Sequence, residues 1–428
     1  MAEAVIFRAG TLVLLFGFCL SAEQASPPGA PVPGGRLTLD EALSLAERYN
    51  PLLRAVSAQT AGARAGITTA RAYPNPEFSF LAGQQLSRWN GGMPGAPGVL
   101  QHYSFSQPIE LPSVRKTRIH TAELGRESSE YAMAETRIAV RAAVKQSFYQ
   151  VLRRRGEVQL AEENLRLIED LQRRIQVQVN VGEAARLELT RADAEVATAR
   201  TFARSAQLRL VTATSALRAA ISAPLSATID PQGSLQTPPV LPPLELLREE
   251  TVAKHPALAQ ADAEIRRADS RLRHERALRK PQPYLRTEFE EQPDLRFYRF
   301  GISLPIPIWN KREGPIAEAT AELDRMKAMS DVRRLEITAA LERAYGQYEV
   351  ATQQVASYQD GVLREAEAAL QAAEAAYKFG ERGIIEVLDA QRVLRSVRSD
   401  YLNAQYDLQS ALIDLEQLRA VDFGGNTP

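Results

Sequence analysis

The chain has 428 residues, and its 52 Lys and Arg residues balance its 52 Asp and Glu residues. This balance offers no basic excess of the kind that binds nucleic acid, so we expect no nucleic-acid partner. The one cysteine, Cys19, lies near the N-terminus. A chain that loses this region has no thiol left, which excludes disulfides, thiol catalysis and cysteine-based zinc sites.

The N-terminus has the layout of a secretory signal peptide, which we place at residues 1–22. A basic residue precedes an apolar run from Thr11 to Leu20, and small residues follow. The run is too short to span a bilayer as a helix. A buried N-terminal helix is the alternative, but the Pro/Gly-rich segment 23–36 separates the run from the rest of the chain. Lipoprotein processing needs a small residue before its cysteine, and the large Phe18 stands there, which argues against acylation of Cys19. Whether Cys19 is lipidated stays open.

The rest of the chain is two copies of one unit, which we place at residues 37–223 and 244–420. A Pro-rich linker, 224–243, joins the copies, and a tail, 421–428, follows the second. Six landmarks recur in the same order. They are Asn50-Pro51 with His255-Pro256, Pro74-Asn75-Pro76 with Pro281-Gln282-Pro283, Phe105 to Ile109 with Ile302 to Ile306, Arg115-Lys116 with Lys311-Arg312, Val181-Gly182-Glu183 with Phe379-Gly380-Glu381, and Leu187-Glu188-Leu189 with Ile385-Glu386-Val387.

After a first helical stretch, each unit has two predicted strands, in which apolar residues alternate with small or polar ones. Phe78 and Phe80 flank Ser79, for example, and Tyr298 and Phe300 flank Arg299. Each run has about ten residues, the length of a membrane-spanning strand. Four strands cannot close a barrel in lipid, so membrane insertion would require several chains to share one barrel. Ordinary hairpins on a soluble core are the alternative. The predicted strands cover residues 76–86, 100–109, 283–291 and 295–307.

Long helices follow the strands in each unit. No proline lies between Pro112 and Pro224 or between Pro315 and Pro428, and both stretches are rich in good helix formers. A helix of this length reaches ~100 Å, which predicts a rod or tube and the fold class α+β. The predicted helices cover residues 113–181, 185–221, 314–379 and 384–419. Coiled-coil positions are held by Val144, Phe148, Val151, Val158, Leu165, Ile168 and Ile175 in the first copy and by Leu341, Tyr345, Tyr348, Val355, Val362, Ala366, Ala373 and Tyr377 in the second.

From Leu37 to about Ala420 the chain resembles the outer membrane efflux family typified by TolC, and more closely its CzcC-like branch associated with metal-cation efflux. The run from Gly380 to Gln391 is the most specific part of the resemblance. The other residues that carry it are Leu39 to Leu43, Asn50-Pro51, Pro74 to Phe78 and Gln107 to Leu111.

The resemblance implies a homotrimer in the outer membrane of a Gram-negative bacterium. Its three chains would form a twelve-stranded β-barrel, continued by a periplasmic α-helical coiled-coil barrel. Such a protein is the channel of a tripartite efflux system and conducts solutes passively, which in this branch include metal cations. Its partners would be an inner-membrane pump and a periplasmic adaptor that docks at the helical tips. These tips would contain Gly182, Glu183, Arg186, Gly380, Glu381 and Gly383.

Glu386 and Asp389 stand three residues apart and therefore share one helix face. In a trimer this face would place six carboxylates at the periplasmic mouth, a ring that favours cations. The resemblance assigns the acidic ring of the entrance to this position. It also matches Tyr377 and Arg382 to residues that clamp the closed entrance to the neighbouring hairpin, where Glu188 stands. A solvated helix face without such a role is the alternative.

No feature of the sequence indicates catalysis. The four histidines have no metal-ligand spacing, and the phosphate-binding, nucleotide-binding and serine-nucleophile motifs are missing. We therefore expect neither an enzyme nor a cofactor. A periplasmic coiled-coil adaptor or scaffold protein of a transport complex is the alternative function, but an adaptor would not need strands of lipid-spanning length. Which solute is exported, and which pump and adaptor are served, stays open.

Overall fold

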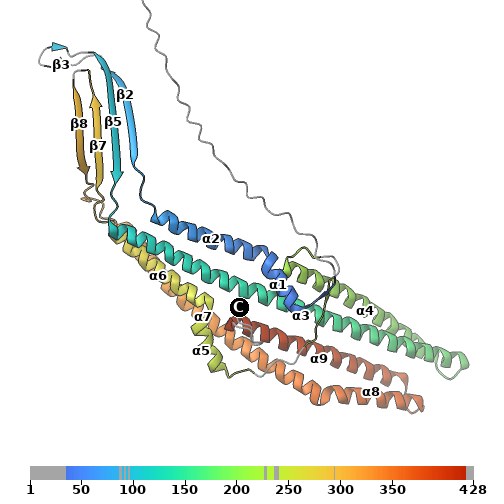
Figure 1. Cartoon of the computed structure of the whole chain (residues 1–428). Helices are drawn as coiled ribbons and strands as arrows, with labels where there is room; N and C mark the ends of the chain where they lie inside the picture. Colours follow the sequence, from blue (N-terminus) through green and yellow to red (C-terminus); the bar gives the residue numbers. More distant parts are fainter. Residues whose placement is uncertain are drawn as a thin grey trace, which may run out of the picture.

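The computed structural model describes residues 35–85, 89–90, 93–94, 97–225, 229–235, 241–293 and 295–420. The predicted signal peptide with Cys19, nearly all of segment 23–36 and the tail 421–428 lie outside them. The described chain is elongated, with a four-stranded sheet at one end and long helices that run away from it (Figure 1).

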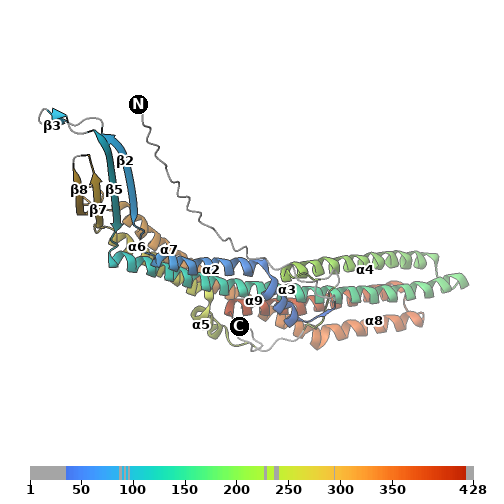
Figure 2. The ribbon, with the colours of Figure 1, turned by 45° about the horizontal axis from the view of Figure 1, so that its top comes forward.

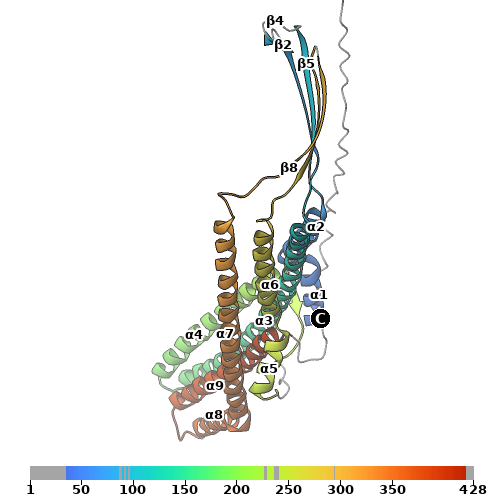
Figure 3. The same cartoon turned by 90° about the vertical axis from the view of Figure 1, so that its left-hand side faces the viewer.

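The sheet combines one hairpin from each copy. Its strands are β2 (Glu77–Gln85), β5 (Gly98–Pro108), β7 (Tyr284–Glu291) and β8 (Arg296–Ser303), antiparallel in the order β2-β5-β7-β8. The two copies therefore meet along β5 and β7, while β2 and β8 form the edges. Two short strands, β3 (Trp89–Asn90) and β4 (Met93–Pro94), pair beyond the sheet, which curves away above the helix ends (Figure 3).

One predicted strand is too long. The prediction of a strand over 295–307 is wrong at its C-terminal end, because β8 ends at Ser303. Pro305 and Pro307 follow, and proline has no backbone N–H to donate to a strand ladder.

Near the sheet, four helices form a wall one helix thick. They pack in the order α2 (Pro51–Arg71), α3 (Pro112–Val181), α6 (Pro256–Ala277) and α7 (Glu313–Ser357) (Figure 2). Neighbouring helices run in opposite directions, because α2 and α6 lead into the sheet while α3 and α7 leave it. Across the described residues, every helix lacks the combination of length and apolar character that a membrane crossing needs.

Farther from the sheet, other helices continue the same wall. α4 (Arg186–Ile221) packs on α3 on the side of α2, and α9 (Ile384–Arg419) packs between α3 and α7 on the side of α6. α8 (Leu363–Lys378) continues α7 and packs on α9. The hairpin α3–α4 and the hairpin α8–α9 both turn at the end remote from the sheet (Figure 1).

The helix predicted over 314–379 is interrupted. It consists of α7, a five-residue π turn over Tyr358–Val362, and α8, which ends at Lys378. In the π turn the N–H of Leu363 bonds to the carbonyl of Tyr358, five residues back. The coiled-coil position predicted for Val362 is therefore wrong, and its side chain is exposed.

A core lies at mid-length in each copy, where short helices pack on the wall. In the first copy, α1 (Leu39–Tyr49) covers Val144, Phe148 and Leu217. In the second, Leu247 of α5 (Leu244–Lys254) packs on Leu341 and Leu415. The strands β1 (Arg36–Leu37) and β6 (Asp230–Pro231) pair in parallel beside the first core and connect the linker to it.

Asn50 and His255 perform the same task in the two copies. The Oδ1 of Asn50 accepts a hydrogen bond of 2.9 Å from the N–H of Leu52 at the start of α2. The Nδ1 of His255 accepts one of 3.1 Å from the N–H of Ala257 at the start of α6. Burial, with a smaller effect from Arg333, lowers the pKa of His255 from 6.5 to about 4. His255 is therefore neutral at neutral pH, as an acceptor at this ring nitrogen must be.

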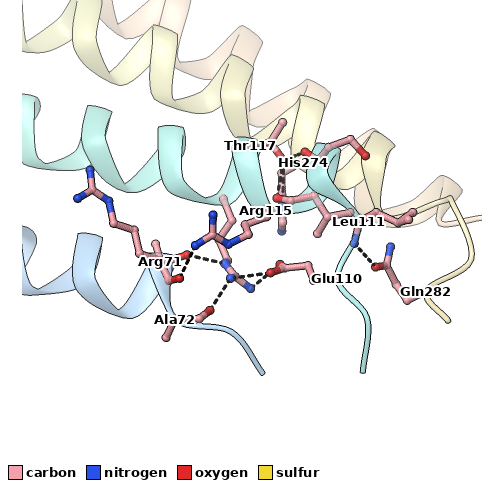
Figure 4. Close-up of polar contacts among 12 residues, drawn as sticks. Arg71, Ala72, Glu110, Leu111, Arg115, Thr117, His274 and Gln282 are labelled. Atoms are coloured by element: carbon pink, nitrogen blue, oxygen red, sulfur yellow. Dashed lines mark hydrogen bonds and ion pairs between the residues drawn. The ribbon is translucent and has the colours of Figure 1, made fainter. Parts of the chain in front are cut away.

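A polar cluster fixes the joint between sheet and helices (Figure 4). Arg118 on α3 pairs at 2.6 Å with Glu110, whose side chain is 6% exposed. The same guanidinium donates to the carbonyls of Ala70 and Ala72 at the end of α2, at 3.0 and 2.9 Å. Two further contacts tie the second copy to this joint, namely Leu111 N–H to Gln282 at 3.3 Å and Thr117 to His274 at 3.0 Å.

Candidate functional site at the helical tips

Both helical hairpins turn through a glycine in the left-handed conformation. Gly182 ends α3 with φ 82°, and Gly380 follows α8 with φ 76°. In each turn the next N–H reaches back to a carbonyl five residues earlier, from Glu183 at 2.8 Å and from Glu381 at 2.9 Å. Only glycine adopts this conformation without strain, so both turns depend on it.

Gly383 has a different role. It caps the N-terminus of α9 with φ −81° and ψ 165°, an extended conformation open to any residue. A Cβ at this position would meet nothing within 4 Å. Gly383 supplies no side-chain acceptor, so the first N–H groups of α9 have no side-chain cap.

An apolar cluster joins the two hairpins just above their turns. α3 and α9 supply most of it, and α4 contributes two smaller side chains. α8 contributes only partly buried residues, among them Ala373 and Tyr377. The buried members are Ile168, Leu171, Ile175, Ala192, Val196, Ile384, Val387 and Leu388.

A direct polar contact also joins the hairpins. The hydroxyl of Tyr377 on α8 donates a hydrogen bond of 2.8 Å to Oε1 of Gln178 on α3. Burial, together with the nearby charge of Glu188, raises the pKa of Tyr377. The structure thus brings Tyr377 close to Glu188, while its hydrogen-bond acceptor is Gln178.

Glu386 and Asp389 lie on the exposed face of α9, each beside an arginine of the same hairpin. Arg382 Nη1 is 3.4 Å from Glu386 Oε1, and Arg392 Nη1 is 3.0 Å from Asp389 Oδ1. Within the chain, Arg382 therefore contacts Glu386 and not Glu188. Exposed pairs of this kind are weak, so either arginine can exchange its partner at small cost.

Two residues of this region were not among the predicted ones. Arg392 stands three residues after Asp389, and this helical spacing is a usable signal. Little in the sequence indicated Gln178 as a contact residue. The duplication aligns Tyr377 with Val179, and nothing marks the preceding residue as its partner. The other predicted tip residues, Glu183, Arg186 and Glu381, are exposed at the turns.

Among the described residues, no three His, Cys, Asp or Glu side chains come together as a metal site.

The one-layer helical wall with its four-stranded sheet is the fold of outer-membrane channel proteins. The structure of CusC aligns with a TM-score of 0.75 at 19% identity, covering 89% of this chain and 91% of that one. The structure of VceC from Vibrio cholerae aligns with a TM-score of 0.77 at 14% identity, covering 90% and 96%.

The chain belongs to the outer membrane efflux protein family, whose model matches residues 42–223 and 247–420. It is also similar to the cobalt-zinc-cadmium resistance protein CzcC of Cupriavidus metallidurans, with 28% identity over 386 residues, or 90% of each chain. The family resemblance predicted from the sequence is thereby confirmed, and with it the location in the outer membrane of a Gram-negative bacterium. The relatives in this family are efflux channels, not enzymes.

Proposed function

We propose that the chain is the outer-membrane duct of a tripartite efflux system, and that three copies form a twelve-stranded barrel continued by a helical tube. The observation that carries this proposal is the division of the sheet into an apolar and a polar face. Such a sheet has a place between lipid and water, and its edges require further chains.

The apolar face carries an aromatic row that crosses all four strands. Phe80, Tyr103, Phe289 and Tyr298 are direct neighbours in register. The ring centroids of Phe80 and Tyr103 are 4.8 Å apart, and those of Tyr103 and Phe289 are 6.0 Å apart. Tyr298 is 77% exposed in the single chain. Lipid is the solvent that suits an exposed aromatic surface of this kind.

The opposite face carries a polar row that crosses the same four strands. Ser79, Ser104, Glu288 and Arg299 form one row in register. The hydroxyls of Ser79 and Ser104 are 2.7 Å apart, and Arg299 lies 3.5 Å from Glu288. A water-filled lumen is the environment that suits this face.

The open edges support closure by copies of the same chain. β2 and β8 each lack a second neighbour in the described sheet, and they run in opposite directions. The antiparallel alternation therefore continues when β8 of one chain pairs with β2 of the neighbouring chain. The edge helices carry exposed apolar residues as well, including Leu208 on α4 and Leu335 on α7. Three copies, the number the family resemblance implies, supply twelve strands.

The tips supply the proposed entrance. Glu386 and Asp389 from three chains would form the acidic ring. Tyr377, Arg382 and Glu188 would form the gate links. Arg382 is exposed and has an exchangeable partner, which suits a link to a neighbouring copy. The exposed turns at Gly182 and Gly380 are the proposed docking surface for the periplasmic adaptor, and the inner-membrane pump would deliver solutes through it.

We further propose metal cations as the exported solutes. The support is the similarity to CzcC, a cobalt-zinc-cadmium resistance protein, together with the acidic face of α9. A gene for a heavy-metal-type pump beside this one would strengthen the assignment, whereas a drug-type pump would favour organic solutes.

The test is purification in detergent followed by gel and bilayer measurements. We expect an SDS-resistant, heat-modifiable trimer that conducts ions across a planar bilayer. The double variant Phe80→Glu with Tyr298→Glu puts charge on the lipid face and should abolish membrane insertion. A water-soluble monomer without conductance would sink the duct proposal and favour a periplasmic adaptor.

A further inference from the structure

A cavity of about 250 Å³ lies in the second copy, at the joint where α9 gives way to α6. α9 ends at Arg419 and α6 begins at Pro256, and both helices pack between α3 and α7. Pro256 and Ala420 line the cavity together, so it lies at the meeting point of the two helix ends. The edge helices α2, α4, α7 and α8, where neighbouring chains would pack, contribute none of its lining.

Four cationic side chains and one carboxylate line the cavity. Arg137, Arg141 and Lys145 follow one another at intervals of four residues on α3, so they share one helix face. Lys254 adds a fourth charge from the end of α5, and Glu416 of α9 supplies the carboxylate. Like charges at this helical spacing destabilise each other. An anion in the cavity would therefore stabilise the cluster.

Two of the four cations are paired with carboxylates of the protein. Arg141 lies 2.8 Å from a glutamate of α1, and Lys145 lies 2.7 Å from Glu416. Arg137 and Lys254 have no ion pair with any residue that the structure describes, and both residues are exposed. These two cations are the ones that remain for a bound anion.

The cavity also has an apolar side. Ile138 of α3 and Ile413 of α9 line it, together with Pro256 and three alanines. A simple inorganic anion would leave this apolar surface in contact with water. The volume lies just below the range of about 300–1,000 Å³ that is typical of pockets for drug-sized ligands. The lining therefore suits a small group that carries a carboxylate beside an apolar side chain.

The corresponding joint of the first copy is bridged by the chain itself. Asn50, at the start of α2, donates a hydrogen bond of 3.2 Å from Nδ2 to the carbonyl of Ala220 on α4. Ala223 and Leu225, which follow the end of α4, pack against the first core. His255 takes the place of Asn50 in the second copy, and it makes no hydrogen bond to α9 within the described part of the chain. The joint of the second copy is thus left with room for a further segment.

We propose that the cavity is a binding site for a peptide segment that carries a carboxylate beside an apolar side chain. Arg137 and Lys254 bind the carboxylate through charge-assisted hydrogen bonds. The apolar side chain of the ligand packs on Ile138 and Ile413. Such a segment fills the joint and holds α3, α9 and the start of α6 together.

Two sources of the segment have this chemistry. One is the chain itself, because the sequence after Ala420 reads Val421-Asp422-Phe423, with an aspartate between two apolar residues. The residues after α4 provide the precedent, since Ala223 and Leu225 pack on the first core. The other source is an acidic segment of a partner protein.

The experiment measures binding of the peptide acetyl-Val-Asp-Phe-amide to the full-length chain in detergent, by isothermal titration calorimetry. The wild type is compared with a tail variant, Asp422→Asn with Phe423→Ala, which removes the chemistry of the chain's own segment. Arg137→Gln and Lys254→Gln are then added to the tail variant. Arg166→Gln, at an exposed position elsewhere on α3, is the control substitution. The peptide acetyl-Val-Asn-Phe-amide, which lacks only the charge, is the control ligand.

If the chain supplies its own segment, the tail variant should bind the peptide about tenfold more tightly than the wild type, because the competing segment is gone. If a partner supplies it, both should bind the peptide equally. In either case we expect affinity to fall about tenfold for the uncharged peptide, and about tenfold on loss of Arg137 and Lys254. Arg166→Gln should change nothing. The site would be overturned if neither the wild type nor the tail variant bound the peptide, or if binding ignored the charge of the peptide or the loss of the two cations.

Discussion

Tyr377 and Gln178 lie on different hairpins, in different copies of the repeat, and a 2.8 Å hydrogen bond joins them. Replacement of Tyr377 by Phe keeps the ring in the apolar cluster and removes this bond. We expect the contact between the hairpins to lose about 1 kcal/mol and, in the proposed duct, the channel to open roughly fivefold more often. The measurement is single-channel recording in planar bilayers. Tyr131→Phe, which loses a contact within its own helix, is the control, and an equal effect of both variants would contradict the link.

The acidic face of α9 is expected to govern ion selectivity. The double variant Glu386→Gln with Asp389→Asn keeps size and shape but removes six charges from a trimer. Cation preference should fall several-fold, and block by polyvalent cations should weaken. Reversal potentials in asymmetric salt measure the first effect. Glu245→Gln, on an exposed glutamate of α5, should leave selectivity unchanged.

The tip glycines should differ in their tolerance of alanine. Gly182→Ala and Gly380→Ala force a Cβ into the left-handed region and should each cost about 1 kcal/mol. Gly383→Ala should be close to neutral, because its backbone is extended and the space around it is open. Thermal unfolding of the three variants gives the comparison, and a Gly383 variant as damaged as the other two would refute this account.

His255 should make the second copy sensitive to acid. Its pKa is about 4 in the folded chain and near 6.5 in the unfolded chain. Above pH 6.5 both states are neutral and the full stability is present. As pH falls from 6.5 towards 4, His255 binds a proton in the unfolded state but stays neutral in the folded state. The free energy of unfolding therefore declines by up to about 3 kcal/mol.

Asn50 occupies the position of His255 in the first copy, so asparagine is the natural replacement for His255. His255→Asn retains an acceptor for the N–H of Ala257 and removes the titrating group, so unfolding temperatures at pH 7.5 and pH 5 should converge. His120→Asn, at an exposed position on α3, should not change the pH dependence. If the unfolding temperature of the wild type were no lower at pH 5 than at pH 7.5, the effect would be ruled out.

The joint beneath the sheet should depend on its buried carboxylate. Glu110→Gln leaves Arg118 without its counter-charge, and we expect a loss of about 2 kcal/mol, since Arg118 is partly exposed. Glu123→Gln breaks the exposed pair with Arg71 and should cost less than about 0.5 kcal/mol. Equal effects on thermal unfolding would show that burial of Glu110 does not matter.

Much of the fold could be predicted from local patterns. Alternation located the strands, the proline-free stretches located the helices, and glycine located both turns. The π turn could not be located in this way. Alanine is accepted on every face of these helices, so a local change of helical geometry leaves the apolar pattern nearly intact.

The site was predicted less completely than the fold. Glu386 and Asp389 follow from helical spacing, and so would Arg392. The contact between Tyr377 and Gln178 depends on how two hairpins pack, which no local pattern in either of them encodes.

The helical wall is one layer thick, and small side chains line much of the seam between α3 and α4. α4 presents Ala192, Ala199, Ala203, Ala206 and Ala213 as buried residues. Because these methyl groups set the spacing of the helices, residues on the two outer faces of the wall take little part in holding it together. The faces that meet solute or partner can therefore diverge while the architecture persists, which makes this scaffold readily adapted to new cargo.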